Sequence, residues 1–187
     1  MSVYWIFLLI VLFLFWYEFL YVYQGMKRER VDKNKSYYVL DQKDSKQASK
    51  LLHEVVEDAK KLVKHLQVSY PQHQGVQLLA KRFDPNVISE GNPRHSDFTY
   101  TENKGERMVI CIRNQDMKFH QKNLIMFPVI HELSHLCDAN YDNGHGKDFR
   151  ACFKFFLDEA QKIGIISKPD YDVNPKPYCG MVISSVV

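Results

Sequence analysis

The segment His131-Glu132-Leu133-Ser134-His135 carries the clearest chemical signal in this sequence. It has the pattern H-E-x-x-H, and the residues around it predict a helix. Histidines four positions apart on a helix lie on one side of it, about one turn from each other, where their imidazoles can share a metal ion such as zinc. Zinc lowers the pKa of a bound water from near 16 to about 7, and Glu132 can accept the proton. The pattern therefore predicts one catalytic zinc ion, with His131 and His135 as ligands and Glu132 as general base.

A catalytic zinc site needs a third protein ligand and leaves its fourth position to water. Nine residues separate His135 from His145, which lies in the turn-forming segment Asp142-Asn143-Gly144-His145-Gly146. Such a turn reverses the chain, and glycines on both sides of the histidine allow a close backbone approach. We therefore expect His145 to be the third ligand. Two alternatives stay open: Glu159, on the next predicted helix, and Asp138, which can bind the ion or orient a ligand imidazole.

Apolar residues at helical spacing predict three helices beyond residue 43. The first contains 51–66, and Asp44 or Ser45 can cap its start. The second covers 123–140 and includes the H-E-x-x-H segment, and the third covers 145–163. Strands are expected at 75–83, 98–101 and 106–113, with a hairpin turn at 102–105 and a loop at 84–97. Helices combined with short strands predict an α+β fold.

From about Leu51 to Gly164 the chain resembles the WLM metalloprotease domain, which is related to the SprT and Spartan proteases. The resemblance is carried by four stretches: the strand ending in Phe83, Asn103-Lys104-Gly105 before Ile110-Cys111-Ile112-Arg113, the H-E-x-x-H segment, and His145-Gly146-Lys147-Asp148-Phe149. The spacing between His135 and His145 is longer than is usual in WLM domains and is closer to the SprT arrangement.

This resemblance implies a compact zincin-like domain: a small antiparallel or mixed sheet, an active-site helix and a C-terminal helix. It implies zinc on His131, His135 and His145, with Glu132 as base. It also implies that the strand over 108–113 is a sheet edge to which an extended peptide substrate can add.

Residues 3–23 contain a single charged residue, Glu18. As a helix they would extend about 32 Å, enough to cross a hydrocarbon layer of about 30 Å. A cleaved signal peptide is the alternative, but no basic residue precedes the apolar run and no small-residue cleavage site follows it. Basic residues follow the run directly, which predicts a single-pass membrane protein with its catalytic domain in the cytosol. These residues are Lys27, Arg28, Arg30, Lys33 and Lys35.

These features predict four regions: a transmembrane anchor at 1–24, a juxtamembrane linker at 25–43, a zincin-like metallopeptidase domain at 44–166, and a C-terminal tail at 167–187 that packs on the domain. The net charge of +3 is too small to predict nucleic-acid binding. The expected partners are a protein or peptide substrate and, through residues 3–23, a lipid bilayer.

Four cysteines in 187 residues are too few for a disulfide scaffold. In a cytosolic domain we expect them to be reduced. Cys111, Cys137 and Cys152 occupy apolar-face positions typical of buried thiols. Cys179 is a candidate for a regulatory thiolate that would occupy the open zinc position.

The function predicted from these residues is that of a membrane-anchored zinc metallopeptidase that hydrolyses peptide bonds. Tyr171 and Tyr178 are candidates for stabilising the oxyanion of the reaction. The alternative is a zinc-stabilised structural or binding module on a membrane that has no catalytic activity. A third hypothesis is a tethered partner protein whose histidines bind no metal.

Overall fold

Seven strands form three small sheets in the described part of the chain. The computed structural model describes residues 3–22, 25–94, 99–138, 144–167 and 170–184, and within the first helix it describes the side chains of 4–14 and 16. The first sheet is the antiparallel pair β1 (Met26–Arg30) and β2 (Ser36–Leu40). The second has the order β3-β5-β4, with β3 (Ile88–Glu90) parallel and β4 (Tyr100–Glu102) antiparallel to β5 (Arg107–Ile110). The third is the antiparallel pair β6 (Lys176–Tyr178) and β7 (Met181–Ile183).

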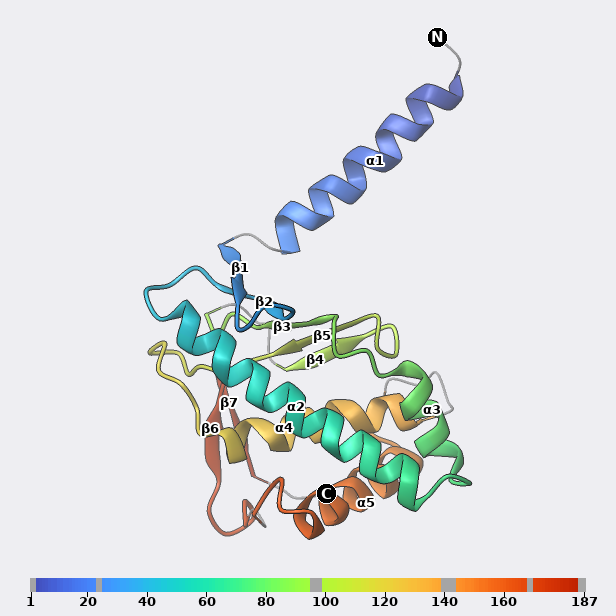
Figure 1. Cartoon of the computed structure of the whole chain (residues 1–187), viewed down its shortest axis with the longest axis vertical. Coiled ribbons are helices and arrows are strands. Elements are labelled where there is room, and N and C mark those ends of the chain that lie inside the picture. Colours follow the sequence, from blue (N-terminus) through green and yellow to red (C-terminus); the bar gives the residue numbers. More distant parts are fainter. Residues whose placement is uncertain (1–2, 23–24, 95–98, 139–143, 168–169, 185–187) are drawn as a thin grey trace.

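Helices pack around the second sheet and around one another (Figure 1). Helix α4 (Lys122–Cys137) lies at the centre, where it contacts α2 (Ser45–Ser69), α3 (Gln74–Arg82) and α5 (Lys147–Lys162). Helix α1 (Val3–Val22) extends away from these elements. Helices and short strands follow one another in separate groups along the chain, and the sheets are mostly antiparallel, so the predicted α+β fold class is confirmed.

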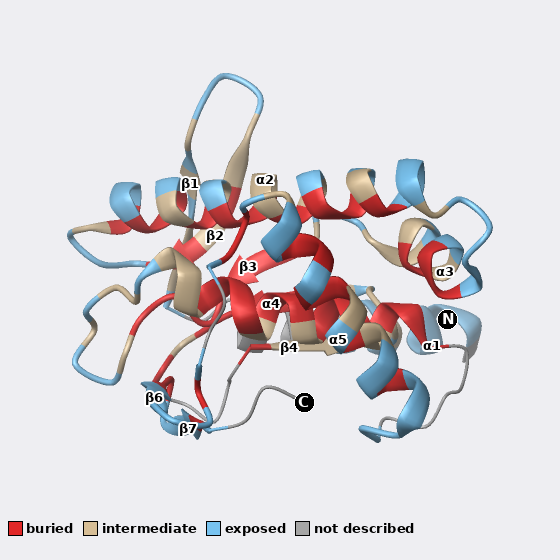
Figure 2. Cartoon of the chain, turned by 90° about the horizontal axis from the view of Figure 1, so that it is seen from below, coloured by how far each residue is buried: buried red, intermediate tan, exposed pale blue. Residues whose placement is uncertain are grey.

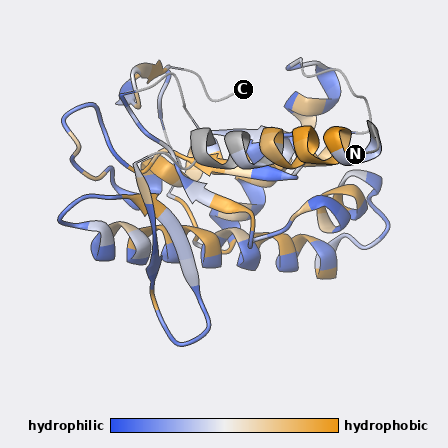
Figure 3. Cartoon of the chain, turned by 90° about the horizontal axis from the view of Figure 1, so that it is seen from above, coloured by the Kyte–Doolittle hydropathy of each residue, from blue (hydrophilic) through white to orange (hydrophobic). Residues whose placement is uncertain are grey.

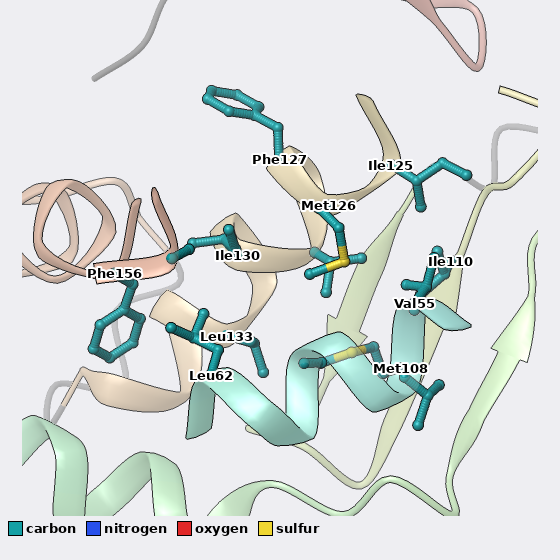
Figure 4. Packing of buried hydrophobic residues seen from close by; sticks show 14 of the residues in the cluster. Val55, Leu62, Met108, Ile110, Ile125, Met126, Phe127, Ile130, Leu133 and Phe156 are labelled. Carbon is teal, nitrogen blue, oxygen red and sulfur yellow. The ribbon is translucent and has the colours of Figure 1, made fainter. Parts of the chain in front are cut away.

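The core lies where one face of α2 meets α4 and the second sheet (Figure 4). Val55 and Leu62 of α2 pack in the same buried cluster as Met108 of β5 and Ile130 and Leu133 of α4. Figures 2 and 3 show the same division along α2, which is buried and apolar toward α4 and exposed and polar on its outer side. This two-sided pattern is the reason that the helical spacing was readable from the sequence.

The segment expected to be a strand at 75–83 is instead helix α3. His73 caps this helix, because its Nδ1 accepts a hydrogen bond from the backbone nitrogen of Val76 at 3.3 Å. Val76 and Leu79, three positions apart, are both buried. In a short apolar run, the spacing of the apolar residues fits a helix and a strand equally well. The packing of this segment against α4 favours the helix.

The loop expected at 84–97 contains strand β3, which pairs in parallel with β5. The predicted hairpin of β4 and β5 is confirmed as an antiparallel pair. Residues 108–110 of the strand expected at an edge, 108–113, lie in β5, which has β3 on one side and β4 on the other. The edge prediction for 108–113 is therefore wrong, and β4 occupies the outer position of the sheet.

Residues 25–43 and 167–187 both contain regular structure. The first of these regions, expected to be a linker, forms the β1–β2 hairpin, and the backbone nitrogen of Leu40 donates a hydrogen bond to Glu90 Oε2 at 2.8 Å. The second, expected to be a tail, forms the β6–β7 hairpin. Both hairpins are held by contacts with residues far away in the sequence, which local patterns do not reveal.

The prediction that residues 3–23 anchor the chain in a membrane is wrong. No helix in the described part of the chain is both long enough and apolar enough to span a bilayer. The dependent prediction of a single-pass membrane protein with its catalytic domain in the cytosol is therefore wrong as well.

The cysteines form two disulfides, Cys111–Cys179 and Cys137–Cys152, so the expectation of reduced thiols is also wrong. The partners are 68 and 15 positions apart, with Cα–Cα distances of 6.4 and 6.6 Å. The first disulfide attaches the β6–β7 hairpin to the chain just after β5. Since Cys179 is bonded to Cys111, it has no thiolate to place in a zinc site, and the regulatory hypothesis for Cys179 fails.

Candidate metal centre

The structure brings His131, His135 and His145 together into one cluster. One ring nitrogen from each histidine lies within 4.8 Å of those of the other two, a grouping that can hold a metal ion. Nε2 of His131 and Nε2 of His145 are 3.0 Å apart. His131 and His135 lie one turn apart on α4, and His145 precedes α5 by two residues. The turn expected at 142–146 lies partly outside the described residues, but His145 reaches the pair on α4.

The donor set and its spacing suit zinc. Zinc binds imidazole nitrogens at about 2.0–2.1 Å in a tetrahedral arrangement, which puts the nitrogens about 3.3 Å from one another. The 3.0 Å separation between the His131 and His145 nitrogens is close to that value, and all three ligand nitrogens lie within 4.8 Å of one another. Burial, together with the neighbouring imidazoles, lowers the pKa of His131 to about 3 and that of His135 to about 4. Both rings are therefore neutral at physiological pH, the state in which a nitrogen lone pair can bind a metal.

Phe149 packs among all three histidine rings. Its ring centroid lies 4.8 Å from that of His131, 4.4 Å from that of His135 and 4.7 Å from that of His145. Arg150 supports the same turn, because its Nη1 donates a hydrogen bond to the carbonyl oxygen of His145 at 2.5 Å. Phe149 and Arg150 thus fix the position of His145 from the first turn of α5. Phe149 belongs to the stretch that carries the family resemblance, whereas Arg150 was not expected at the site from the sequence.

The end of α4 that carries His135 is tied to three other parts of the fold. Arg82 Nη1 donates hydrogen bonds to the carbonyl oxygens of Leu136 at 2.9 Å and Asp138 at 2.7 Å. Lys104 Nζ, in the turn between β4 and β5, donates to the carbonyl oxygen of His135 at 3.4 Å. The Cys137–Cys152 disulfide joins this end of α4 to α5. Cations and donors at a helix C-terminus bind its free carbonyl groups, so the last turn that bears His135 is held firmly.

Glu132 is buried, with 7% of its surface exposed, and faces the β4 strand. Burial raises the pKa of Glu132 to about 8, opposed in part by a hydrogen bond from the backbone of Thr101. A nearby cation favours the ionised form of a carboxyl group. A metal ion on the three histidines would therefore shift Glu132 toward the carboxylate, the form that can accept a proton.

Neither of the two alternative third ligands belongs to the histidine cluster. Glu159 binds elsewhere: its Oε2 is 2.7 Å from Nε2 of His65, its Oε1 accepts a hydrogen bond from the hydroxyl of Tyr70 at 2.9 Å, and Lys162 forms an ion pair with it. Asp138 is buried at the end of α4. The geometry therefore favours His145 over both carboxylates as the residue that completes the cluster.

We predict that Glu159 makes folding stability dependent on pH. Burial opposes its ionisation, but hydrogen bonds from Lys162, His65 and Tyr70 outweigh burial and lower the pKa of Glu159 to about 2. Its stabilising contribution is present above the unfolded-state pKa of about 4.3 and is lost as the pH falls toward 2. Glu159→Gln should lower the free energy of unfolding by about 1.5–3 kcal/mol at pH 7. This difference from the wild type should become smaller as the pH falls from 4.5 to 2.

Urea unfolding at a series of pH values measures this difference. The control is Asp158→Asn, because Asp158 is exposed and its ion pair with Lys154, at 3.4 Å, lies on the helix surface. A difference between wild type and Glu159→Gln that stays constant from pH 7 to pH 2 would contradict the prediction.

Neither tyrosine candidate has a free hydroxyl directed at the site. The Tyr178 hydroxyl donates a hydrogen bond to the carbonyl oxygen of Cys111 at 2.7 Å and also contacts Thr99 Oγ1. Burial raises the pKa of Tyr178 far above its usual value, so it keeps this proton. Tyr171 packs edge-on against Phe127 and does not line either hollow beside the histidines. The structure therefore gives no support to an oxyanion role for Tyr171 or Tyr178.

Two hollows open on either side of the cluster and share His131, Glu132 and His145 as wall residues. One, of about 660 Å³, is bordered by His135 and by residues 100–104 of β4 and its turn. The other, of about 360 Å³, is bordered mainly by apolar side chains of α4, α5 and β7. A group bound at the histidines would thus border both hollows.

The sequence of the chain is similar to that of a known protein. No protein-family model matches the chain. Over 98 residues it is 30% identical to the uncharacterized protein R325 of Acanthamoeba polyphaga mimivirus, which corresponds to 52% of this chain and 49% of that protein. The chain therefore spans about half the length of this curated relative.

Solved structures give a second comparison. The crystal structures of Wss1 from Saccharomyces cerevisiae and of a Wss1 mutant match this chain with a TM-score of 0.51 and 18% sequence identity. The matches cover 67% of this chain and 86% and 87% of the Wss1 chains. At this identity the similarity concerns the fold alone. The chain thus has a WLM-like α+β fold, similar to that of Wss1.

Proposed function

We propose that this chain is a zinc-dependent metallopeptidase in which His131, His135 and His145 bind the metal and Glu132 is the general base. The convergence of the three histidines beside a buried Glu132 is the observation that carries the proposal. The WLM-like fold and the two hollows that flank Glu132 also support it. Three histidine ligands leave one coordination position open, as catalytic zinc sites do.

A bound zinc ion would supply Lewis-acid chemistry, because it polarises a carbonyl group and makes water acidic enough to deprotonate near neutral pH. Glu132 then accepts the proton of the attacking water and passes it to the departing amine nitrogen. The backbone nitrogen of Thr101 orients Glu132 by its hydrogen bond to the carboxylate. Burial of Glu132 keeps bulk water from competing for that proton.

Strand β4 is the proposed binding edge for an extended peptide. Within the described residues it pairs only with β5, and its residues Tyr100, Thr101 and Glu102 line the larger hollow beside the histidines. An extended peptide can add to such an edge through main-chain hydrogen bonds. That position would bring a peptide bond to the histidine cluster and to Glu132.

Elemental analysis of the full chain, purified with zinc present and then dialysed, tests the metal site. We expect about one zinc per chain for the wild type and almost none for His145→Ala, because two ligands hold zinc much more weakly than three. The matched control is His53→Ala: His53 lies on α2, where its Nδ1 is 3.1 Å from the hydroxyl of Tyr37 on β2, and it does not belong to the cluster, so this variant should retain zinc. Less than about 0.2 zinc per wild-type chain would overturn the proposal.

Incubation of the same samples with a pool of tryptic peptides tests the activity. New peptide ends that form with the zinc-loaded wild type, and not with His145→Ala, are expected. Zinc binding without any hydrolysis would instead indicate the alternative, a zinc-stabilised module with no catalytic activity.

A further inference from the structure

The smaller hollow beside the cluster has an apolar lining that the proposed chemistry does not explain. Its volume is about 360 Å³, the space of roughly a dozen waters at about 30 Å³ each. His131, Glu132 and His145 are among its lining residues, and the remainder is contributed mainly by helices α4 and α5 and by strand β7. Its apolar lining is made by Phe127, Pro128, Phe149 and Phe153 together with residues 181–183 of β7, and Thr99, Arg150, Tyr178 and Ser184 complete the wall. We call this hollow the apolar pocket.

The aromatic side of the apolar pocket is a packed unit. Phe127 of α4 and Phe153 of α5 meet edge to face, with ring centroids 5.2 Å apart. Phe153 also contacts His131 edge to face, at 5.2 Å between centroids. Because these rings are part of the core cluster, they present a rigid surface to the space beside the histidines.

The opposite wall comes from β7 and is attached to the domain by long-range contacts. Cys179, in the turn before β7, forms the disulfide with Cys111. Tyr178 donates its hydrogen bond to the carbonyl oxygen of the same Cys111. Met181 and Val182 are exposed, at 47% and 60%, even though they line the apolar pocket. Exposed apolar side chains around a fixed hollow lose contact with water when an apolar group enters it.

The larger hollow on the other side of the cluster has a polar lining. Besides the histidines and Glu132, it is bordered by Thr101, Glu102, Asn103 and Lys104 together with Tyr100. A peptide lying across the cluster therefore meets an apolar surface on one side of the reacting bond and a polar surface on the other. The two surfaces should therefore favour different substrate residues on the two sides of the scissile bond.

We propose that the apolar pocket binds a large apolar side chain, such as that of leucine, methionine or phenylalanine, on the residue that flanks the scissile bond on one side. This inference rests on the proposed peptidase function and specifies its substrate class. A single methylene group in an apolar pocket changes kcat/KM by about 10–200-fold. Exchanging leucine for serine at this position should therefore lower kcat/KM by at least tenfold, whereas the residue on the other side of the bond should tolerate polar groups.

Cleavage of a defined peptide pool by the zinc-loaded full chain tests the inference. Sequencing of the new ends by mass spectrometry gives the residues on both sides of each cleaved bond. The pocket-filling variant is Val182→Trp, because Val182 is exposed on β7 and a larger side chain there reaches the pocket without entering the core. The matched control is Val173→Trp, at a valine that is 81% exposed and lines neither hollow.

We expect the wild type and Val173→Trp to cleave next to large apolar residues on one side, and Val182→Trp to lose at least tenfold in kcat/KM for those sites relative to sites with small residues. Cleavage by the wild type with no such preference, or a preference that Val182→Trp leaves unchanged, would overturn the inference while the peptidase function stands. Complete absence of hydrolysis would overturn the peptidase function itself.

A binding measurement separates recognition from turnover. Fluorescence anisotropy of the inactive Glu132→Gln chain, with zinc present, compares two labelled peptides that differ only by leucine or serine at the selected position. At least tenfold tighter binding of the leucine peptide is expected. Equal affinity for the two peptides would argue against the apolar pocket as the recognition site.

Discussion

Glu132→Gln is expected to lower kcat/KM for peptide hydrolysis by about 10²–10⁴-fold, the usual contribution of a general acid–base group. Glutamine has nearly the same shape as glutamate and can still accept the hydrogen bond from the Thr101 backbone. It cannot accept a proton from water or return one to the amine. The geometry around the histidines should therefore persist while the proton transfer is lost.

Three measurements on the same preparation check this prediction: the rate of peptide cleavage, the zinc content and the thermal unfolding temperature. Only the rate should change. Glu54→Gln is the matched control, because Glu54 is exposed on α2 and should leave all three unchanged. Retention of activity within about tenfold would remove Glu132 from the mechanism. A loss of zinc together with activity would instead give Glu132 a part in building the site.

Arg113→Met should lower the free energy of unfolding by about 3–5 kcal/mol, the usual cost of removing one partner from a buried ion pair. Arg113 is 1% exposed. Its Nε donates to Glu90 Oε1 at 2.6 Å, and its two Nη atoms donate to the carboxylate of Asp44 at 2.8 and 2.9 Å. Its guanidinium also lies over the Phe119 ring, 4.1 Å from the centroid. Removing it leaves Glu90 buried without its charge partner.

Urea denaturation of the wild type and the variant measures the effect. Lys154→Ala, which removes an exposed ion pair with Asp158, should cost less than about 1 kcal/mol and serves as the control. In the double variant Arg113→Met/Glu90→Gln the cost should fall below the sum of the two single changes, because both remove the same interaction. A loss of less than about 1 kcal/mol for Arg113→Met would show that the buried pair does not hold the sheet.

Arg113 also explains why one expectation about α2 was only half right. Asp44 lies at the N-cap position of the helix, as predicted, but its side chain makes no capping hydrogen bond. Its carboxylate binds Arg113 instead, and Arg113 holds the pKa of Asp44 below its usual value. A capping residue is recognised by local sequence, whereas an arginine 69 positions away competes for it only in the folded protein.

Sequence patterns that extend over one or two helical turns were enough to predict much of the candidate site. The H-E-x-x-H spacing by itself predicted that His131 and His135 share one side of a helix, and α4 carries them in that way. Helix α2 and the β4–β5 hairpin were also predictable, because amphipathic spacing and turn-forming residues are local signals. The structure places His145 beside the pair, and its role as a zinc ligand stays a prediction.

The amino-acid sequence by itself thus determined the residue types and spacings of the histidine cluster, because these depend on the fixed geometry of a helical turn. Only the tertiary structure decided which distant segments meet. Tertiary contacts of this kind determine the two disulfides, the parallel pairing of β3 with β5 and the outer position of β4. The apolar pocket formed by α4, α5 and β7 also depends on these tertiary contacts. The free energy of these contacts comes from burying surfaces far apart in the chain, and no local pattern records which surface is the partner.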